Sequence, residues 1–235
     1  MYCIIRKLRI ELYAFILAII LLISLPAYFM ITDTPKQHKY KYIALGDSYT
    51  IGESVGESER FPVQLTERLN ADSIDIAEPL IIAKTGWTTD ELTAAITEKN
   101  VKDTFDIVTL LIGVNNQYRG RSAEEYRLEL KQLINTAINY SGGNVDNVFV
   151  LSIPDWGVTP FAEGRDRNKI ASEIDEYNRV KKEECDKAGI KYYDITRISR
   201  INDASLVAPD GLHPSGKMYK MWVDKIYGDI KQSFK

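Results

Sequence analysis

The sequence predicts an α/β fold in which helices cover both faces of a parallel β-sheet of about five strands. After residue 40, short apolar segments alternate with longer amphipathic segments, which is the pattern of repeated β-α-β units. Residues 105–113 form a nearly continuous apolar run, typical of a central parallel strand that is buried on both faces. The chain has 235 residues, of which 45% are hydrophobic and 27% charged. This composition suits a folded domain and excludes a disordered or low-complexity chain.

The first predicted strand and helix follow residue 40. Residues 41–45 (KYIAL) predict a short strand, because the only charge of this apolar segment is at its first position. Residues 61–70 predict a helix, since Phe61, Leu65 and Leu69 are spaced four apart and therefore share one face.

The alternation continues through the next three segments. Residues 78–84 (EPLIIAK) predict the second strand. Residues 88–99 predict a helix, because Thr88 and Glu91 have the three-residue spacing of a capping box. The third predicted strand is the apolar run at residues 105–113.

A longer helix and a fourth strand come next. Residues 122–143 predict a helix with Ser122 and Glu125 as its capping box and a pair of glycines at its end. Residues 147–154 (NVFVLSIP) predict the fourth strand, because this short segment is almost entirely apolar.

The last three predicted elements complete the fold. Residues 166–189 predict a long helix that ends at Gly189, and its charged residues 181–184 (KKEE) predict a solvated face. Residues 190–195 predict a short fifth strand, and residues 215–234 predict the closing helix.

The N-terminal segment has a different character. Residues 12–31 are twenty consecutive positions without a charge, and as a helix they would extend roughly 30 Å, the thickness of the hydrocarbon core of a bilayer. Arg6, Lys7 and Arg9 precede this run, and Asp33 follows it. The positive-inside rule therefore predicts a cytoplasmic N-terminus and places the remainder of the chain outside the cytoplasm.

A cleaved signal peptide is the alternative interpretation of this segment. The apolar run is longer than the roughly 7–15 residues of a signal peptide, and Leu25 occupies a position before Ala27 where a cleavage site requires a small residue. The sequence therefore favours a membrane anchor at residues 1–31, a polar tether at residues 32–39 and one domain at residues 40–235. Signal cleavage would instead give a secreted or periplasmic domain.

Charge and cysteine content exclude several function classes. The formal net charge is −3, which gives no electrostatic basis for nucleic-acid binding. Two cysteines cannot form a disulfide framework or a four-cysteine zinc site. No G-x-G-x-x-G motif follows the first strand, so we expect no dinucleotide cofactor. No cluster of histidine, cysteine and carboxylate residues has the spacing of metal ligands, so we expect no metal. His38 and His213 are the only histidines.

Polar and glycine-rich clusters follow the predicted strands or precede the last helix. In parallel sheets, binding sites form outside the carboxyl ends of the strands, so these clusters are predicted to share one edge of the sheet. The clusters are Gly46-Asp47-Ser48-Tyr49-Thr50, Thr85-Gly86-Trp87, Gly113-Val114-Asn115-Asn116 and Asp210-Gly211-Leu212-His213-Pro214.

These clusters contain the groups that acyl transfer requires. Ser48 needs a base to become nucleophilic, and His213 is the candidate because His38 lies in the tether. Asp210 can orient His213 from three residues away. The backbone N–H groups of Ser48 and Gly86, together with the side-chain amide of Asn115, are candidate oxyanion donors.

With these residues in place, the sequence resembles the SGNH hydrolases, also called GDSL lipases or esterases, over nearly the whole predicted domain. Gly46-Asp47-Ser48 is similar to the nucleophile block, Gly86 and Asn115 to the oxyanion donors, and Asp210 with His213 to the final D-x-x-H block. The resemblance implies a flavodoxin-like three-layer α/β/α sandwich, a metal-free Ser-His-Asp mechanism and carboxylic-ester substrates. Tyr49 replaces the usual leucine, and Asn116 replaces an aspartate often found in the third block.

The sequence therefore predicts a membrane-anchored, extracytoplasmic serine esterase that acts on a small-molecule, glycan or lipid ester without a cofactor. Trp87, Trp156 and Phe161 flank the predicted site and are candidates either for lining the substrate pocket or for buried packing. The alternative function is a surface-tethered glycan- or lipid-binding protein that has the same fold and no catalytic activity.

Overall fold

A five-stranded parallel sheet forms the centre of the domain. The computed structural model describes Tyr13 and residues 38–234, and the account that follows concerns residues 38–234. The sheet order is β2-β1-β3-β4-β5, and every pair of neighbouring strands is parallel. The strands are β1 (Tyr42–Gly46), β2 (Leu80–Ala83), β3 (Ile107–Leu111), β4 (Val148–Leu151) and β5 (Lys191–Tyr193). The predicted parallel sheet of about five strands is thus confirmed.

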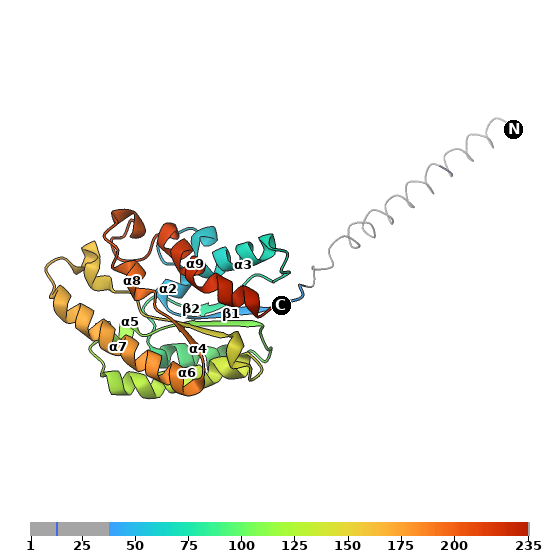
Figure 1. Ribbon diagram of the computed structural model, residues 1–235, viewed down its shortest axis with the longest axis horizontal. Coiled ribbons are helices and arrows are strands. Elements are labelled where there is room, and N and C mark those ends of the chain that lie inside the picture. Colours follow the sequence, from blue (N-terminus) through green and yellow to red (C-terminus); the bar gives the residue numbers. More distant parts are fainter. Residues whose placement is uncertain (1–12, 14–37, 235) are drawn as a thin grey trace, which may run out of the picture. The chain divides into compact units, whose positions relative to one another are not determined.

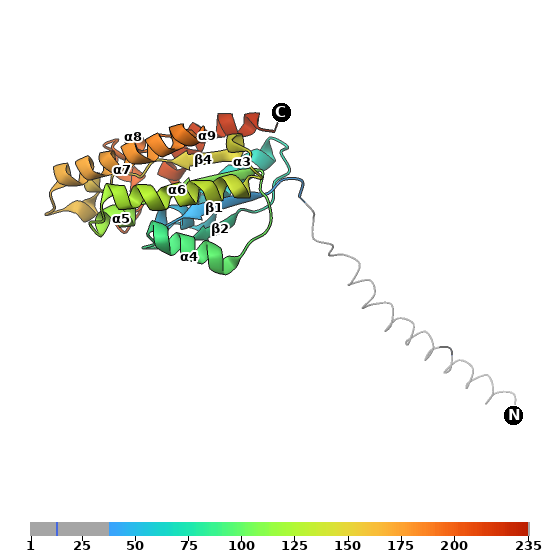
Figure 2. The ribbon, with the colours of Figure 1, turned by 90° about the horizontal axis from the view of Figure 1, so that it is seen from below.

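Helices cover both faces of this sheet. Helices α3 (Phe61–Ala71) and α9 (Gly216–Gln232) pack together on one face (Figure 1). The opposite face is covered by α4 (Thr89–Lys99), α6 (Ala123–Tyr140) and α7 (Arg167–Ala188), which lie in front of the strands in Figure 2. The domain therefore has the three layers that the sequence predicts, and the two apolar interfaces between them form the core.

Two strands are shorter than the apolar runs that predict them. The run at residues 105–113 forms β3 only over Ile107–Leu111, and the run at residues 147–154 forms β4 only over Val148–Leu151. Ile112 and Ile153 lie beyond the ends of the strands yet are completely buried. Hydrophobicity reports burial rather than strand pairing, so the apolar pattern overestimates strand length.

Three short helices have no counterpart among the predicted elements. They are α2 (Ser48–Ile51), α5 (Val114–Tyr118) and α8 (Thr196–Ser199). Four or five residues are too few to show helical periodicity. Two of them, α2 and α5, follow β1 and β3 closely, so they lie at the carboxyl edge of the sheet, where the predicted site residues gather.

One predicted surface is wrong. Of the charged residues 181–184, Lys181 is completely buried and Glu184 is only 7% exposed. The Lys181 ammonium donates a hydrogen bond to the Leu151 carbonyl at the end of β4, at 2.8 Å. A long side chain can pass along the helix to reach a polar partner, so its charge does not by itself predict a solvated position.

The predicted membrane segment cannot be compared with the structure. The anchor at residues 1–31, apart from Tyr13, and all but the last two residues of the tether at residues 32–39 lie outside the described residues. Within the part of the chain that the structure describes, no helix is both long and apolar enough to cross a membrane.

Candidate active site

The turn after β1 presents Ser48 at the start of a helix. The Asp47 carboxylate caps α2 by accepting a hydrogen bond from the Tyr49 N–H at 3.0 Å. Ser48 is therefore the first helical residue, and it is 5% exposed. A Cβ atom at Gly46 would lie 2.1 Å from Thr50 Oγ1 and 2.3 Å from the Leu111 carbonyl oxygen, so only glycine fits before this turn.

The Asp47 side chain is itself completely buried. Burial raises the pKa of the Asp47 carboxyl to about 7, although the hydrogen bond from the Tyr49 N–H and the positive charge of Lys181 oppose the shift. Burial likewise lowers the pKa of Lys181 to about 7, against the attraction of Cys185 and Asp47. The turn that carries Ser48 thus contains a buried acid, Asp47, and a buried base, Lys181, interacts with it electrostatically.

The side chains of His213 and Asp210 are in direct contact in the loop before α9. The Nδ1 atom of His213 lies 2.5 Å from Oδ2 of Asp210. The other carboxylate oxygen, Oδ1, accepts the backbone N–H groups of Leu212 at 2.9 Å and His213 at 3.0 Å. The Ser54 hydroxyl also donates to Oδ2, at 2.6 Å. The carboxylate therefore holds both the imidazole ring and the backbone that carries it.

These contacts also keep Asp210 ionised and determine the tautomer of a neutral His213 ring. Partial burial favours a neutral Asp210, but the hydrogen bonds from Ser54, His213 and the backbone outweigh it and hold the pKa of Asp210 well below its usual range. An ionised carboxylate can only accept hydrogen bonds, so the proton of a neutral His213 ring resides on Nδ1. The Nε2 atom then keeps a lone pair that can accept a proton.

Ser48 and His213 line the same small pocket. Its volume is about 190 Å³, and aromatic and aliphatic side chains form much of its wall. The lining residues are Ser48, Tyr49, Thr85, Gly86, Val114, Asn115, Tyr118, Trp156, Phe161, Leu212 and His213. The edge-to-face contact between Tyr49 and His213, with ring centroids 5.8 Å apart, helps to fix the imidazole in the wall of the pocket.

The three residues that carry the predicted N–H donors line this pocket from different parts of the chain. Gly86 follows β2 with φ of +85°, a conformation that favours glycine, and its carbonyl accepts a hydrogen bond from the Arg119 guanidinium at 2.7 Å. The Asn115 amide donates to the Trp87 carbonyl at 2.9 Å, which leaves its second N–H for another acceptor. The N–H of Ser48, at the first position of α2, has no acceptor within the helix.

The sequence comparison identifies the family. Residues 44–221, more than half of the chain, match the GDSL-like lipase/acylhydrolase family. The chain belongs to the GDSL-like lipase/acylhydrolase family. This match confirms the resemblance found from the four sequence blocks. The domain is therefore a carboxylic ester hydrolase of the esterase or lipase type. No curated protein is significantly similar to the chain in sequence.

Solved structures confirm the fold of this GDSL-family domain. TesA has a TM-score of 0.65 at 16% identity, with 82% of this chain and 99% of that chain covered. The acetylxylan esterase Axe2 from Geobacillus stearothermophilus has a TM-score of 0.64 at 18% identity, covering 82% and 94%. The esterase EstA from Pseudoalteromonas sp. has a TM-score of 0.61 at 16% identity, covering 83% and 99%. At such low identity the similarity extends to the fold alone.

The structure brings most of the predicted site residues together. Ser48, Gly86, Asn115 and His213 all line the pocket, and Asp210 contacts His213 directly. Among the three aromatic candidates, Trp156 and Phe161 line the pocket, whereas Trp87 does not and takes part through its carbonyl. His38 lies elsewhere, with its Nδ1 atom 2.9 Å from Oδ1 of Asp75.

Sequence reasoning missed several residues of this GDSL-family site. Tyr118 lines the pocket, and the Ser54 hydroxyl donates a hydrogen bond to Asp210. The guanidinium of Arg165 lies over three aromatic rings of the pocket wall. Tyr118 is signalled in the sequence as an aromatic residue three positions after Asn115. Ser54 has no sequence signal, because its partner is 156 residues away.

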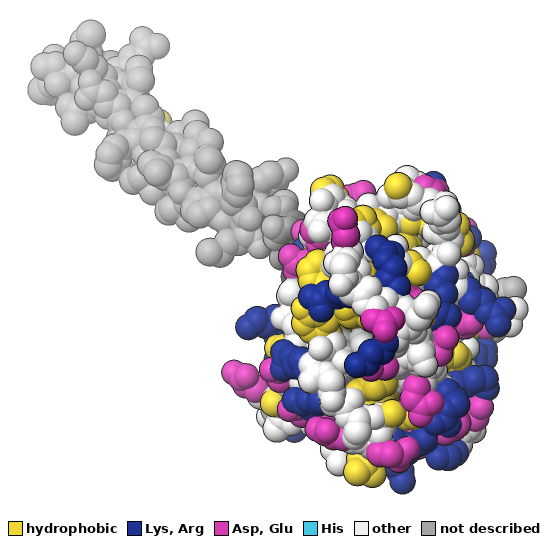
Figure 3. Space-filling view, turned by 90° about the vertical axis from the view of Figure 1, so that its left-hand side faces the viewer, with side chains coloured by type: hydrophobic (Ala, Val, Ile, Leu, Met, Phe, Trp, Pro, Cys, Tyr) yellow, Lys and Arg dark blue, Asp and Glu magenta, His cyan; other side chains and the backbone are white. Residues whose placement is uncertain are grey.

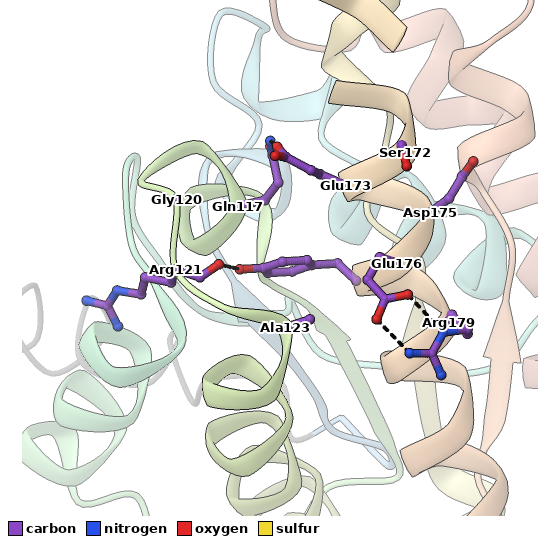
Figure 4. Close-up of a pocket in the computed structure, with 10 residues that line it drawn as sticks. Gln117, Gly120, Arg121, Ala123, Ser172, Glu173, Asp175, Glu176 and Arg179 are labelled. Atoms are coloured by element: carbon purple, nitrogen blue, oxygen red, sulfur yellow. Dashed lines mark hydrogen bonds and ion pairs between the residues drawn. The ribbon is translucent and has the colours of Figure 1, made fainter. Parts of the chain in front are cut away.

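A larger hollow beside α7 does not contain these groups. It has a volume of about 570 Å³ between α7 and the connection from α5 to α6 (Figure 4). Its charged residues are already engaged, as shown by the Glu176–Arg179 ion pair and by Gln117, whose amide donates to Glu173 at 2.7 Å. Within the described residues, no group of three or more histidine, cysteine, aspartate or glutamate side chains could hold a metal ion. The predicted site residues Ser48, Asn115 and His213 line the smaller pocket instead.

The surface around the carboxyl edge of the sheet carries both signs of charge. Helices α2 and α5 lie toward the left-hand end of the sheet in Figure 1, and Figure 3 views the domain from that side. Basic and acidic side chains are interspersed there, with hydrophobic side chains between them (Figure 3). Such a surface lacks the uniform positive field that attracts nucleic acid.

The structure explains why asparagine occupies position 116 in this family member. Asn116 is completely buried, and its Oδ1 accepts the Thr89 N–H at 3.1 Å. Its Nδ2 donates to Thr89 Oγ1 at 2.6 Å and to Oε2 of Glu129 at 3.4 Å. The Thr89 hydroxyl in turn donates to Glu129. The site requires an amide donor, because a carboxylate at position 116 would face a second carboxylate.

We expect Asn116→Asp to destabilise the domain by about 1–3 kcal/mol, because it replaces a buried donor with a charge next to Glu129. Chemical denaturation measures this change. In the background of Glu129→Gln, the same substitution should cost markedly less, since the neighbouring charge is gone and the glutamine amide can donate. If Asn116→Asp lowered the free energy of unfolding equally in the parent and in Glu129→Gln, the proposed repulsion between positions 116 and 129 would be wrong.

Proposed function

We propose that the domain hydrolyses carboxylic esters with Ser48 as the nucleophile, His213 as the general base and acid, and Asp210 as the residue that orients His213. One observation carries this proposal: Ser48 and His213 line a single pocket, and the imidazole is held there by a carboxylate at 2.5 Å. Membership of the GDSL-like family supports ester hydrolysis as the reaction.

The proposed reaction proceeds in two steps. Nε2 of His213 takes the proton of Ser48 Oγ while Oγ bonds to the carbonyl carbon, and the electron pair of the C=O bond moves to oxygen. The bond to the alcohol then breaks, and the leaving oxygen takes the proton from His213. Water repeats the sequence on the acyl-enzyme, which releases the carboxylic acid and returns the proton to Ser48.

The negative oxygen of each tetrahedral intermediate requires donors that are already in position. We propose that the N–H groups of Ser48 and Gly86 and the unused amide N–H of Asn115 provide them. Each such donor is typically worth about 2.7–4 kcal/mol in transition-state stabilisation. The hydrogen bond from Arg119 to the Gly86 carbonyl and that from Asn115 to the Trp87 carbonyl orient these donors.

The size of the pocket favours a short acyl group. A volume of about 190 Å³ is below the roughly 300–1,000 Å³ of sites that enclose drug-sized ligands. Acetyl esters are therefore the substrates we propose first, and Axe2, which has the same fold, is an acetylxylan esterase.

Covalent labelling tests the proposed mechanism. EstA, another esterase of this fold, is inhibited by monoethylphosphonate, which supports the use of a phosphorus-based probe. We expect a fluorophosphonate to modify the protein at Ser48, as identified by mass spectrometry of the peptide. Binding of an ester without turnover and without labelling would instead support a non-catalytic glycan- or lipid-binding protein.

We also propose that residues 12–31 anchor the protein in the membrane, with the domain outside the cytoplasm. The support is the sequence of this segment, an uncharged run that follows three basic residues. Protease added to intact cells should then degrade the domain, and the full-length chain should sediment with membranes. A full-length chain that stays in the cytosolic fraction would contradict the anchor, and a shorter chain in the medium or periplasm would indicate signal cleavage.

A further inference from the structure

The side chain of Arg165 lies against the aromatic residues that line the pocket. The guanidinium carbon of Arg165, in the loop between β4 and α7, lies 5.4 Å from the ring centroids of Tyr118, Trp156 and Phe161. The guanidinium also donates a hydrogen bond to the Tyr118 hydroxyl at 3.3 Å. Contacts with three ring faces at this distance are attractive and hold the group in place without neutralising its charge.

The charge of Arg165 is not matched by a carboxylate. Arg165 is exposed and forms no ion pair with the residues that the structure describes. Two carboxylates near the pocket have other partners: Asp210 holds His213, and Glu53 accepts a hydrogen bond from the Thr85 hydroxyl. A guanidinium has five N–H donors, so most of those of Arg165 are available to a ligand.

The position of these rings defines which part of a substrate would meet Arg165. The pocket of about 190 Å³ accommodates a short acyl group at Ser48, so the alcohol part of the ester must extend out of it. Tyr118 is 48% exposed and Phe161 is 42% exposed, and both rings therefore form part of the pocket's outer wall. An alcohol group that leaves the pocket along these rings comes within reach of the guanidinium.

We propose that Arg165 is a specificity-determining residue that binds an anionic group, a carboxylate or a phosphate, on the alcohol part of the substrate. The inference rests on the proposed esterase function, and it narrows the substrates to anionic esters of short acids. A guanidinium matches the planar oxygen pair of a carboxylate or phosphate with two parallel hydrogen bonds. The three rings around the guanidinium keep this fork ordered before the substrate arrives, which reduces the entropy lost on binding.

Three esters with the same acetyl group test the inference. They are meta-acetoxybenzoate, meta-acetoxyphenyl phosphate and the uncharged meta-acetoxybenzamide. For each ester, kcat/KM of Arg165→Gln is compared with kcat/KM of the parent protein, because the three leaving groups differ in intrinsic reactivity. We expect kcat/KM for the two anionic esters to fall about tenfold to a hundredfold in the variant, and that for the amide to change less than about twofold. The ratio of the losses for carboxylate and phosphate identifies the preferred anion.

A matched control separates a specific contact from a general charge effect. Lys169 on α7 is 70% exposed, and Lys169→Gln removes one positive charge without touching the aromatic rings. We expect kcat/KM of this variant for each of the three esters to equal that of the parent protein. Equal losses for charged and uncharged esters in Arg165→Gln would show that Arg165 only supports the loop and would overturn the inference, as would no loss for any ester.

Binding to an inactive protein keeps the inference separate from the proposed catalytic function. In Ser48→Ala, calorimetry should show meta-acetoxybenzoate binding more tightly than meta-acetoxybenzamide, and this difference should disappear in Ser48→Ala/Arg165→Gln. Equal affinities for the two compounds in Ser48→Ala would overturn the inference even if the parent hydrolyses esters. A parent that hydrolyses none of the esters would count against the proposed function, while the binding difference would still support anion recognition by Arg165.

Discussion

Replacement of Ser48 by alanine is expected to lower kcat for acetyl esters by about 10⁴- to 10⁶-fold and to abolish fluorophosphonate labelling. The substitution removes the only atom that would bond to the carbonyl carbon, and the remaining groups cannot form an acyl-enzyme. Initial rates with an activated acetyl ester measure the loss. A burst of product in the parent, absent in the variant, would report the acyl-enzyme directly.

The fold should survive this substitution. Ser48 is 5% exposed, and its hydroxyl makes no hydrogen bond to the residues that the structure describes. The α2 cap depends on the Asp47 carboxylate and the Tyr49 N–H, neither of which changes. We expect the free energy of unfolding to change by less than about 1 kcal/mol. A variant that keeps its fold and more than a hundredth of the activity would exclude Ser48 as the nucleophile.

The second large effect is expected for Asp210→Asn. The amide can donate to Nδ1 of His213, which would place the imidazole proton on Nε2 and remove the lone pair that accepts the serine proton. The variant would also lose the negative charge that stabilises the protonated imidazole. We expect kcat/KM to fall by about 10³- to 10⁴-fold at neutral pH. Because its hydrogen bonds keep the pKa of Asp210 far below neutrality, the parent carboxylate is ionised throughout the neutral range.

Ser54→Ala is the matched control for this prediction. It removes one hydrogen bond to Oδ2 of Asp210 but leaves the carboxylate, the imidazole and the two backbone donors in place. We expect a loss of less than about tenfold, since the charge and the tautomer are preserved. Similar losses in Ser54→Ala and Asp210→Asn would show that loop position, rather than the carboxylate charge, controls the activity.

Periodicity and capping signals predict most of the architecture of this domain. The five long helices are predicted with ends within three residues of the observed ones, because each has both an apolar stripe and a recognisable start or end, such as Ser122 or Gly189. The parallel sheet follows from the alternation of these helices with short apolar runs. Strand ends are less predictable, because Ile112 and Ile153 are buried without belonging to a strand.

The catalytic candidates are predictable because parallel sheets place the ends of their strands at one edge. Ser48, Gly86 and Asn115 each follow a strand within four residues, and the structure places them around one pocket. The supporting contacts are not predictable in this way. Ser54 contacts Asp210, 156 residues away, and Arg165 contacts Tyr118, 47 residues away, so the local sequence does not distinguish them from other polar loop residues.

The burial of a charged residue is the feature that the local sequence pattern predicts least well. Lys181 stands beside exposed Lys182 in a run of four charged residues, yet it is completely buried and donates to the Leu151 carbonyl. Neighbouring positions on a helix are rotated by about 100° from each other, and this rotation decides which lysine faces the sheet. Only the position of α7 against β4 reveals it.

The sheet order has a consequence for when the enzyme first becomes active during its synthesis. The strand that carries Ser48 at its end, β1, pairs with β2 and β3, both of which are translated after it. Ser54 and Asp210, which are in contact, are 156 residues apart in the sequence, so Ser48, the proposed nucleophile, leaves the ribosome long before His213 is synthesised. Contacts of such long sequence separation form late in folding. With the proposed mechanism, Ser48 of a nascent chain is therefore inert, and esterase activity begins only when the last segment of the domain has been synthesised and has packed against the sheet.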